Sequence, residues 1–156
     1  MLKEKWLPIL FAMAWALGTA ALGAALTPLT PWYRGLERPW FQPPDWAFGP
    51  AWTLIFALSA AGFVRAWRAG AGRLLILFFV LNGLLNAGWS LLFFTLQRPD
   101  WAMVELVPLW LSILAMMLEA RRHDRRAGQL MAPYLAWVTF AGCLNWAIYR
   151  LNAPFD

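Results

Sequence analysis

The sequence predicts an all-α integral membrane protein built as a bundle of five transmembrane helices. The chain is 62% hydrophobic and only 13% charged, whereas soluble domains average about 25% charged residues. Several apolar runs reach the length of about 20 residues that a helix needs to cross the hydrocarbon core of a bilayer. None of these runs alternates apolar and polar residues, as a membrane-spanning strand would. Composition, run length and periodicity therefore indicate the same class.

The net charge of +5 would suggest nucleic acid as a partner if the chain were soluble. Here the 13 basic residues lie between apolar runs, which is where membrane proteins carry their topology signals. We therefore expect a lipid membrane, and no nucleic acid, as the partner of these charges.

The first helix is expected over residues 6–26, after Lys3 and Lys5. A basic start, an apolar middle and small residues near Ala24 and Ala25 are also typical of a signal peptide. The apolar stretch is long for a signal peptide, and more membrane sequence follows it. We therefore interpret it as a retained transmembrane helix.

Residues 27–46 are expected to form a structured loop, which we call the lid. The stretch from Trp32 to Trp52, WYRGLERPWFQPPDWAFGPAW, contains four tryptophans and four prolines. Each proline removes a backbone donor and crowds the preceding turn, so the stretch cannot be one helix. It is too aromatic for a solvated linker. The pattern favours a cover over a pocket for a flat hydrophobic ligand.

Four more helices are expected over residues 47–67, 74–96, 101–120 and 130–151, which completes a single domain over residues 1–156. A polar turn at residues 97–100 separates the second and third of these, and a compact basic loop at 121–126 separates the last two. Of the 13 basic residues, nine then lie on the side of the N-terminus. The positive-inside rule predicts a cytoplasmic N-terminus, with the lid and the C-terminus outside.

Three of the expected helices carry faces on which aromatic and polar side chains recur at helical spacing. Packing is one explanation, because aromatic residues fill bundles and Asn joins helices by hydrogen bonds. Three such faces beside an aromatic lid favour a cavity instead. The faces are Phe48, Trp52, Phe56, Ser59 and Phe63 on the second helix, Asn82, Asn86, Trp89, Ser90 and Phe93 on the third, and Trp137, Ala141, Leu144 and Asn145 on the fifth.

The remaining reactive side chains give little support to enzyme or metal chemistry. Glu105 is expected to pair with an arginine or to stay neutral near the outer interface, and Glu119 to form an ion pair with the neighbouring basic cluster. One histidine, His123, and one cysteine, Cys143, disfavour a metal site, a disulfide and a Ser-His-Asp triad. His123 is expected to be a solvated loop residue.

Three stretches carry a resemblance to the TspO family, the translocator proteins also called tryptophan-rich sensory proteins or peripheral-type benzodiazepine receptors. The segment WYRGLERPWFQPPDWAFGPAW resembles the lid and the start of the second helix in that family. LNGLLNAGWSLLFF and PYLAWVTFAGCLNWAIYRLN resemble its third and fifth helices. The match runs in order across nearly all of the chain. Two positions depart from it: Phe41 stands where the family usually has Trp, and Asn82 where it usually has Gln.

The resemblance implies a dimeric five-helix membrane receptor or regulator. It implies binding of porphyrins such as protoporphyrin IX, of heme-related tetrapyrroles and of benzodiazepine-type ligands inside the bundle, with no required cofactor and no metal. The pocket positions that it implies are Tyr33, Pro43, Phe48, Trp52, Phe56, Asn86, Trp89, Ser90, Trp137, Ala141 and Leu144.

Two other functions stay open. One is light-dependent breakdown of bound porphyrin, for which the resemblance implies Trp52 and Trp137 as the acting residues. The other is transport of tetrapyrroles or lipids, which five helices without a clear internal repeat disfavour. A sterol motif known from animal members lacks its spacer before Tyr149 and Arg150, so we predict no sterol specificity.

Two surface features complete the expectations. Arg34 and Arg38 in the lid could meet the propionates of a porphyrin by charge-assisted hydrogen bonds, or could be solvated loop charges. Gly83 and Ala87 stand four residues apart, a spacing that allows close helix approach. That approach could serve a homodimer or packing within one bundle.

Overall fold

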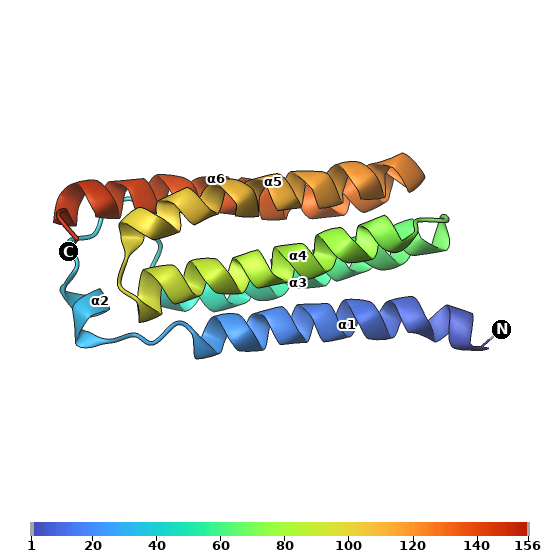
Figure 1. The fold of residues 1–156 in the computed structure, drawn as a ribbon, viewed down its shortest axis with the longest axis horizontal. Helices are drawn as coiled ribbons and strands as arrows, with labels where there is room; N and C mark the ends of the chain where they lie inside the picture. Colours follow the sequence, from blue (N-terminus) through green and yellow to red (C-terminus); the bar gives the residue numbers. More distant parts are fainter. Residues whose placement is uncertain (1, 156) are drawn as a thin grey trace.

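The computed structural model describes the backbone of residues 2–155 and the side chains of residues 6–155. Long helices lie side by side and the two termini lie at opposite ends of the bundle (Figure 1). No strand occurs over residues 2–155, so the all-α prediction is confirmed. The elements are α1 Leu2–Ala25, α2 Pro31–Gly35, α3 Asp45–Arg68, α4 Arg73–Ser90, a π-helical turn η1 Leu91–Thr95, α5 Pro99–His123 and α6 Arg125–Asn152.

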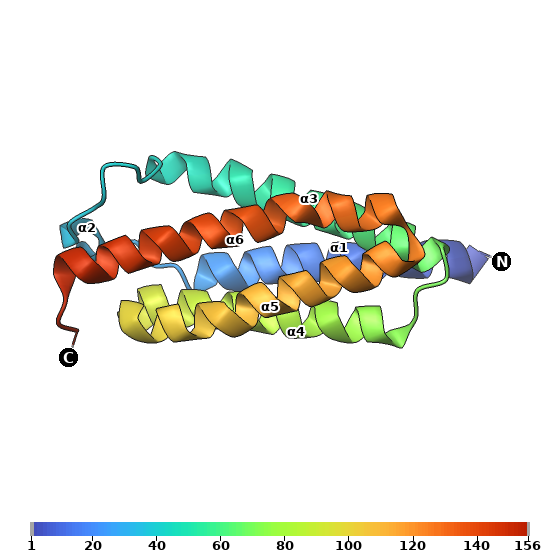
Figure 2. The same cartoon turned by 90° about the horizontal axis from the view of Figure 1, so that it is seen from above.

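The five long helices form a closed ring. α1 packs against α3 and α4, α3 packs against α6, α4 against α5, and α5 against α6. Seen from above, α3 and α4 lie on opposite sides of α1 (Figure 2). Side chains from several helices therefore meet in the space between α3 and α4.

Aromatic rings fill this interior in the half of the bundle away from the lid. Phe63 and Phe79 are fully buried, with ring centroids 4.9 Å apart. Trp15 meets the edge of Phe79 at 4.8 Å, and its indole N–H donates to the Phe79 carbonyl at 2.8 Å. Trp15, which is 7% exposed, therefore lies inside the ring.

The outer surface is apolar, as a lipid-facing surface must be. Leu17, Leu84 and Val104 are each more than 60% exposed. Four segments are long and apolar enough to cross a membrane, namely Trp6–Ala25, Asp45–Arg68, Arg73–Thr95 and Pro99–His123. We had expected five. α6 is also long, but its tyrosines, tryptophans, asparagines and arginines lower its mean hydropathy, so length and composition support four spans.

The expected basic loop at residues 121–126 is almost entirely helical. α5 continues to His123 and α6 begins at Arg125, which leaves Asp124 alone between them. The Asp124 carboxylate accepts from the backbone N–H of Arg126 at 2.7 Å and pairs with Arg65 at 2.7 Å. This N-cap starts α6 directly after α5.

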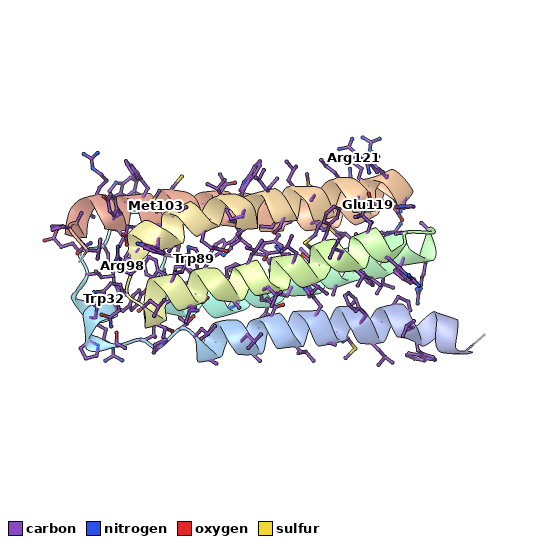
Figure 3. All side chains as sticks on the ribbon, in the orientation of Figure 1. Trp32, Trp89, Arg98, Met103, Glu119 and Arg121 are labelled. Carbon is purple, nitrogen blue, oxygen red and sulfur yellow. The ribbon has the colours of Figure 1, made fainter. Side chains whose placement is uncertain are left out.

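The charges at this end of the bundle follow from the same turn. Glu119 pairs with Arg122 at 3.0 Å and lies 3.4 Å from Nε2 of His123, so its expected ion pair is confirmed. His123 belongs to the last turn of α5 rather than to a loop. Figure 3 places Glu119 and Arg121 at the end of the bundle opposite Trp32 and Trp89.

Candidate functional site

The lid begins with a helical turn that sets the position of Tyr33. Thr30 caps α2 by accepting from the N–H of Tyr33 at 3.4 Å, and Pro31 occupies the first helical position, which its fixed φ suits. Tyr33 is only 6% exposed, and its hydroxyl donates to Asp45 Oδ1 at 3.2 Å. Asp45 is the first residue of α3, so this bond ties the lid to the helix that follows it.

Arg38 completes this anchor. Its guanidinium pairs with Asp45 at 3.2 Å and lies 4.8 Å from the centroid of the Tyr33 ring. Burial, followed by the negative charge of Asp45, raises the pKa of Tyr33 above its ordinary value, so the phenol stays protonated at neutral pH. Arg38 already has an anionic partner, which makes it less available to a ligand carboxylate.

A second contact ties the lid to the end of α6. The N–H of Glu37 donates to Asn152 Oδ1 at 2.8 Å, and Asn152 Nδ2 donates to the Glu37 carbonyl at 2.9 Å. This reciprocal pair joins residues 115 positions apart. Trp32 adds edge-on ring contacts to Phe93 and Phe155. The lid therefore bridges the ends of three long helices.

One cavity near the lid lies between α1, α3 and α4, and we call it the α1-side cavity. Its volume is about 280 Å³, just below the ~300–1,000 Å³ of ligand pockets. Trp52 and Phe56 form a stacked aromatic wall, with centroids 5.2 Å apart. Its lining residues are Thr19, Ala20, Gly23, Ala24, Thr27, Gly49, Trp52, Thr53, Phe56, Asn86 and Ser90.

A smaller cavity of about 50 Å³, the lid-side cavity, lies under the lid between α3, α4, η1 and α6. Phe48 and Gly49 are neighbours in α3 and line different cavities, as do Trp89 and Ser90 in α4. The two cavities are therefore adjacent. The smaller one is lined by Tyr33, Gln42, Phe48, Trp89, Phe93, Phe94, Ala141, Leu144, Asn145 and Ile148.

The π-helical turn η1 shapes the lid-side cavity. The Leu96 N–H bonds to the Leu91 carbonyl, five residues back rather than four, so the turn is wider than in an α-helix. As a result both Phe93 and Phe94 lie against Trp89, at centroid distances of 5.2 and 5.8 Å. An α-helix would direct two consecutive residues to different faces.

Three buried polar atoms on residues lining the lid-side cavity have no hydrogen-bond partner among the described residues. They are Gln42 Oε1, Trp89 Nε1 and Asn145 Oδ1. Asn145 is 1% exposed, and its Nδ2 donates to the Pro99 carbonyl at 2.8 Å. Because buried polar groups usually have partners, two acceptors and one donor here are suited to a polar group on a ligand.

Behind the α1-side cavity, four polar side chains form one chain of hydrogen bonds. Asn86 Nδ2 donates to the Tyr134 hydroxyl at 3.0 Å, and that hydroxyl donates to Asn82 Oδ1 at 3.1 Å. Asn82 Nδ2 donates to Ser112 Oγ at 3.0 Å, and Ser112 donates to the Leu109 carbonyl at 2.7 Å. Asn82 is thus buried in a network, while Asn86 connects the network to the cavity.

Nine of the eleven predicted pocket residues line one or the other of the two cavities. Trp52, Phe56, Asn86 and Ser90 line the α1-side cavity, and Tyr33, Phe48, Trp89, Ala141 and Leu144 line the lid-side cavity. Pro43 and Trp137 line neither. Trp137 lies behind the aromatic wall, 6.3 Å from Trp52 and 5.8 Å from Phe48 between ring centroids.

The contribution of α1 was not predicted from the sequence. Thr19, Gly23 and Thr27 line the α1-side cavity, but small residues in an apolar run resemble ordinary packing positions. Phe94 was also missed, because helical spacing puts it on a different face from Trp89. The spacing of Thr19, Gly23 and Thr27, four residues apart, was the one available signal.

Among the described side chains, no cluster of three His, Cys, Asp or Glu could hold a metal ion. The site instead combines aromatic walls, a few fixed amides and a tethered lid, inside helices long and apolar enough to span a membrane. These features define a class: an all-α integral membrane protein with two adjacent aromatic-lined cavities between its helices.

Comparison with known proteins makes the assignment specific. The profile of the TspO/MBR family matches residues 7–150, and the chain belongs to this family. It is 42% identical over 125 residues to the "Tryptophan-rich protein TspO" of Archaeoglobus fulgidus, covering 78% of this chain and 80% of the relative. The "Tryptophan-rich sensory protein" of Cereibacter sphaeroides is 36% identical over 149 residues, covering 90% and 94%. The human "Translocator protein" is 29% identical over 126 residues, covering 78% and 75%.

Proposed function

We propose that this protein is a membrane receptor or regulator that binds a porphyrin, or another flat hydrophobic molecule of the benzodiazepine type, inside its helix ring. The observation that carries the proposal is the α1-side cavity of about 280 Å³ with its stacked wall of Trp52 and Phe56. Stacking on an aromatic ring contributes about 0.5–1.5 kcal/mol beyond the burial of area. A flat aromatic ligand uses such a wall better than a branched one.

A ligand as large as a porphyrin needs more room than either cavity offers. We propose that it occupies the α1-side cavity and extends into the lid-side cavity as the side chains between them move. Two observations support this. Phe48 and Trp52 lie one turn apart on α3 and line adjacent cavities, and the unpartnered Gln42 and Asn145 oxygens could meet polar groups at the edge of the ligand.

We also propose that α6 is a fifth transmembrane helix and that the N-terminus is cytoplasmic. In support, α6 packs along α5 and α3, and the termini lie at opposite ends of the bundle (Figure 1). The basic residues Arg121, Arg122, Arg125 and Arg126 lie at the end where α5 meets α6, as expected for a cytoplasmic side. The lid and the C-terminus would then face outward.

The proposal is tested by titrating protoporphyrin IX into the purified protein and following the absorption band of the porphyrin. We expect Trp52→Leu to weaken binding about three- to tenfold, which is the loss of one aromatic stacking contact. Trp6→Phe is the matched control, because Trp6 lies at the far end of α1 and is 55% exposed. Wild-type affinity in Trp52→Leu, or an equal loss in the control, would contradict this site.

Light-dependent breakdown of the bound porphyrin is the second candidate function. The observation that favours it is the contact between Trp52 in the cavity wall and Trp137 behind it, at 6.3 Å between centroids. Analysis of the bound porphyrin after illumination distinguishes breakdown from binding alone. The homodimer that the resemblance implies stays a prediction, since Gly83 packs toward Trp15 and Thr19 within the same chain.

A further inference from the structure

The hydrogen-bond chain behind the α1-side cavity has a direction that is fixed at one end. The Leu109 carbonyl can only accept, so the Ser112 hydroxyl must donate to it. Ser112 then has only lone pairs left, and the group of Asn82 that faces it must be the Nδ2 donor. Asn82 Oδ1 consequently faces Tyr134.

The same logic carries through Tyr134 to Asn86. The Tyr134 hydroxyl donates its one proton to Asn82 Oδ1, so its oxygen can only accept a hydrogen bond from the next group. That group is therefore Asn86 Nδ2. The orientation of the Asn86 amide, which could otherwise turn by 180°, is set by a backbone carbonyl on α5 three side chains away.

With Nδ2 committed to Tyr134, Asn86 presents its Oδ1 to the cavity. A methyl group built at Gly23 on α1 would lie 3.9 Å from this oxygen, so the oxygen points toward α1. No described residue donates a hydrogen bond to Asn86 Oδ1. Asn86 is 6% exposed as a residue and lines the α1-side cavity, so a ligand in the cavity can reach this acceptor.

Two other polar groups around the cavity also act as acceptors. Thr27 donates its proton to the Gly23 carbonyl at 2.6 Å, and Thr53 donates to the Gly49 carbonyl at 2.9 Å. Both hydroxyls then have only lone pairs to offer. Thr19 and Ser90 supply hydroxyls that can act in either role.

We propose that the chain from Leu109 to Asn86 makes Asn86 a fixed hydrogen-bond acceptor, and that the α1-side cavity therefore selects flat aromatic ligands carrying an N–H donor. Pyrrole and indole nitrogens on the outer edge of a molecule are such donors, whereas the inner N–H groups of a closed porphyrin ring point to the centre of the macrocycle. Asn86 is the specificity residue, and Tyr134 is a positioning residue that acts through it. The inference deepens the proposed function, because it assigns a ligand chemistry to the same site.

Carbazole and dibenzofuran test this selection, since they are three-ring molecules of the same shape that carry N–H and O at the same position. Each is titrated into the protein in detergent micelles by calorimetry, with protein-free micelles as the reference. We expect carbazole to bind wild type about tenfold more tightly, as one hydrogen bond allows. Equal affinities, or no binding of carbazole, overturn the proposal.

Two variants locate the source of the preference. Asn86→Leu removes the acceptor at similar volume and should bring the two affinities together. Tyr134→Phe keeps the ring that meets Trp52 at 5.9 Å but frees Asn86 Nδ2 from its partner, so the preference should fall below threefold although Asn86 is still present. A full preference in Asn86→Leu overturns the proposal, and a full preference in Tyr134→Phe overturns the positioning role.

Thr139→Val is the control, because the bond from Trp110 Nε1 to Thr139 at 2.8 Å lies on an exposed side of α6, outside the chain. It should leave the carbazole preference unchanged. Protoporphyrin IX is titrated in parallel. If protoporphyrin IX fails to bind while carbazole is still preferred over dibenzofuran, the porphyrin assignment fails and the acceptor role of Asn86 stands. If protoporphyrin IX binds but carbazole is not preferred, only the acceptor role of Asn86 is overturned.

Discussion

Glu105 carries a carboxyl group inside the bundle whose two oxygens are buried and accept no hydrogen bond from the described residues. It lies on the face of α5 that packs against α4, with Oε1 3.7 Å from a methyl group built at Gly88. The arginine partner that the sequence suggested is not there. A buried polar group without a partner destabilises the fold by about 1–3 kcal/mol.

Replacement of Glu105 by methionine should therefore stabilise the protein by about 1–3 kcal/mol, since the side chain keeps its length and loses the unpartnered oxygens. Thermal unfolding in detergent micelles measures the effect. Glu119→Met on the same helix is the control, and the opposite effect is expected there. Glu119 pairs with Arg122 and His123, so loss of its carboxylate should destabilise the protein by about 1 kcal/mol. A lower melting temperature for Glu105→Met would show that the carboxyl has a stabilising partner.

Helical spacing is a local rule that predicts which face of a helix a side chain occupies. Phe48, Trp52 and Asn86 were expected on inward faces from helical spacing, and all three line cavities. Asn82 was expected on the same face as Asn86, and both bond to the Tyr134 hydroxyl. Spacing gives the face of a side chain and cannot give a partner from a distant part of the chain.

At the scale of elements, two glycines allow helices to approach closely at the end where α5 turns into α6. A Cβ at Gly128 would lie 2.7 Å from Arg121 Cβ and 2.9 Å from the Met117 carbonyl oxygen. A Cβ at Gly62 would lie 2.8 Å from the Ala127 carbonyl oxygen. These neighbours are mainly backbone or Cβ atoms, which cannot turn away as a flexible side chain can.

Gly128→Ala should consequently destabilise the protein by about 1–3 kcal/mol, the usual effect of overpacking, through a shift of α6 against α5. Gly18→Ala on α1 is the control, because nothing lies within 4 Å of its Cβ position. There the better helix propensity of alanine should raise stability by up to about 1 kcal/mol. Melting temperatures of both variants decide this, and equal values would contradict the close approach.

Element boundaries were predictable where residues that end helices occur, as with the prolines of the lid and the glycines after α3. They were not predictable at η1 or at Asp124. A run of apolar residues such as Leu91–Thr95 has no signal that separates a π turn from an α turn. Six residues rich in arginine suggested a loop, yet one aspartate cap suffices to start α6.

At the scale of the whole molecule, the lid connects the ends of the helices on one side of the bundle. It follows α1, leads into α3, and is held to α6 by the reciprocal bonds between Glu37 and Asn152 at 2.8 and 2.9 Å. No pattern in the sequence indicates a contact between positions 115 residues apart. These two bonds link the lid to the end of α6.

Asn152→Ala should therefore open the lid without unfolding the bundle. It removes both bonds, each of which contributes about 0.5–1.5 kcal/mol, so amide hydrogen exchange at Glu37 should rise about tenfold while exchange at the buried Phe79 stays unchanged. Bound protoporphyrin should also dissociate several-fold faster. Asn152→Asp keeps the acceptor for the Glu37 N–H and loses the donor to its carbonyl, so Glu37 should stay largely protected. Unchanged exchange at Glu37 in Asn152→Ala would mean that Tyr33 and Asp45, joined at 3.2 Å, hold the lid without help from α6.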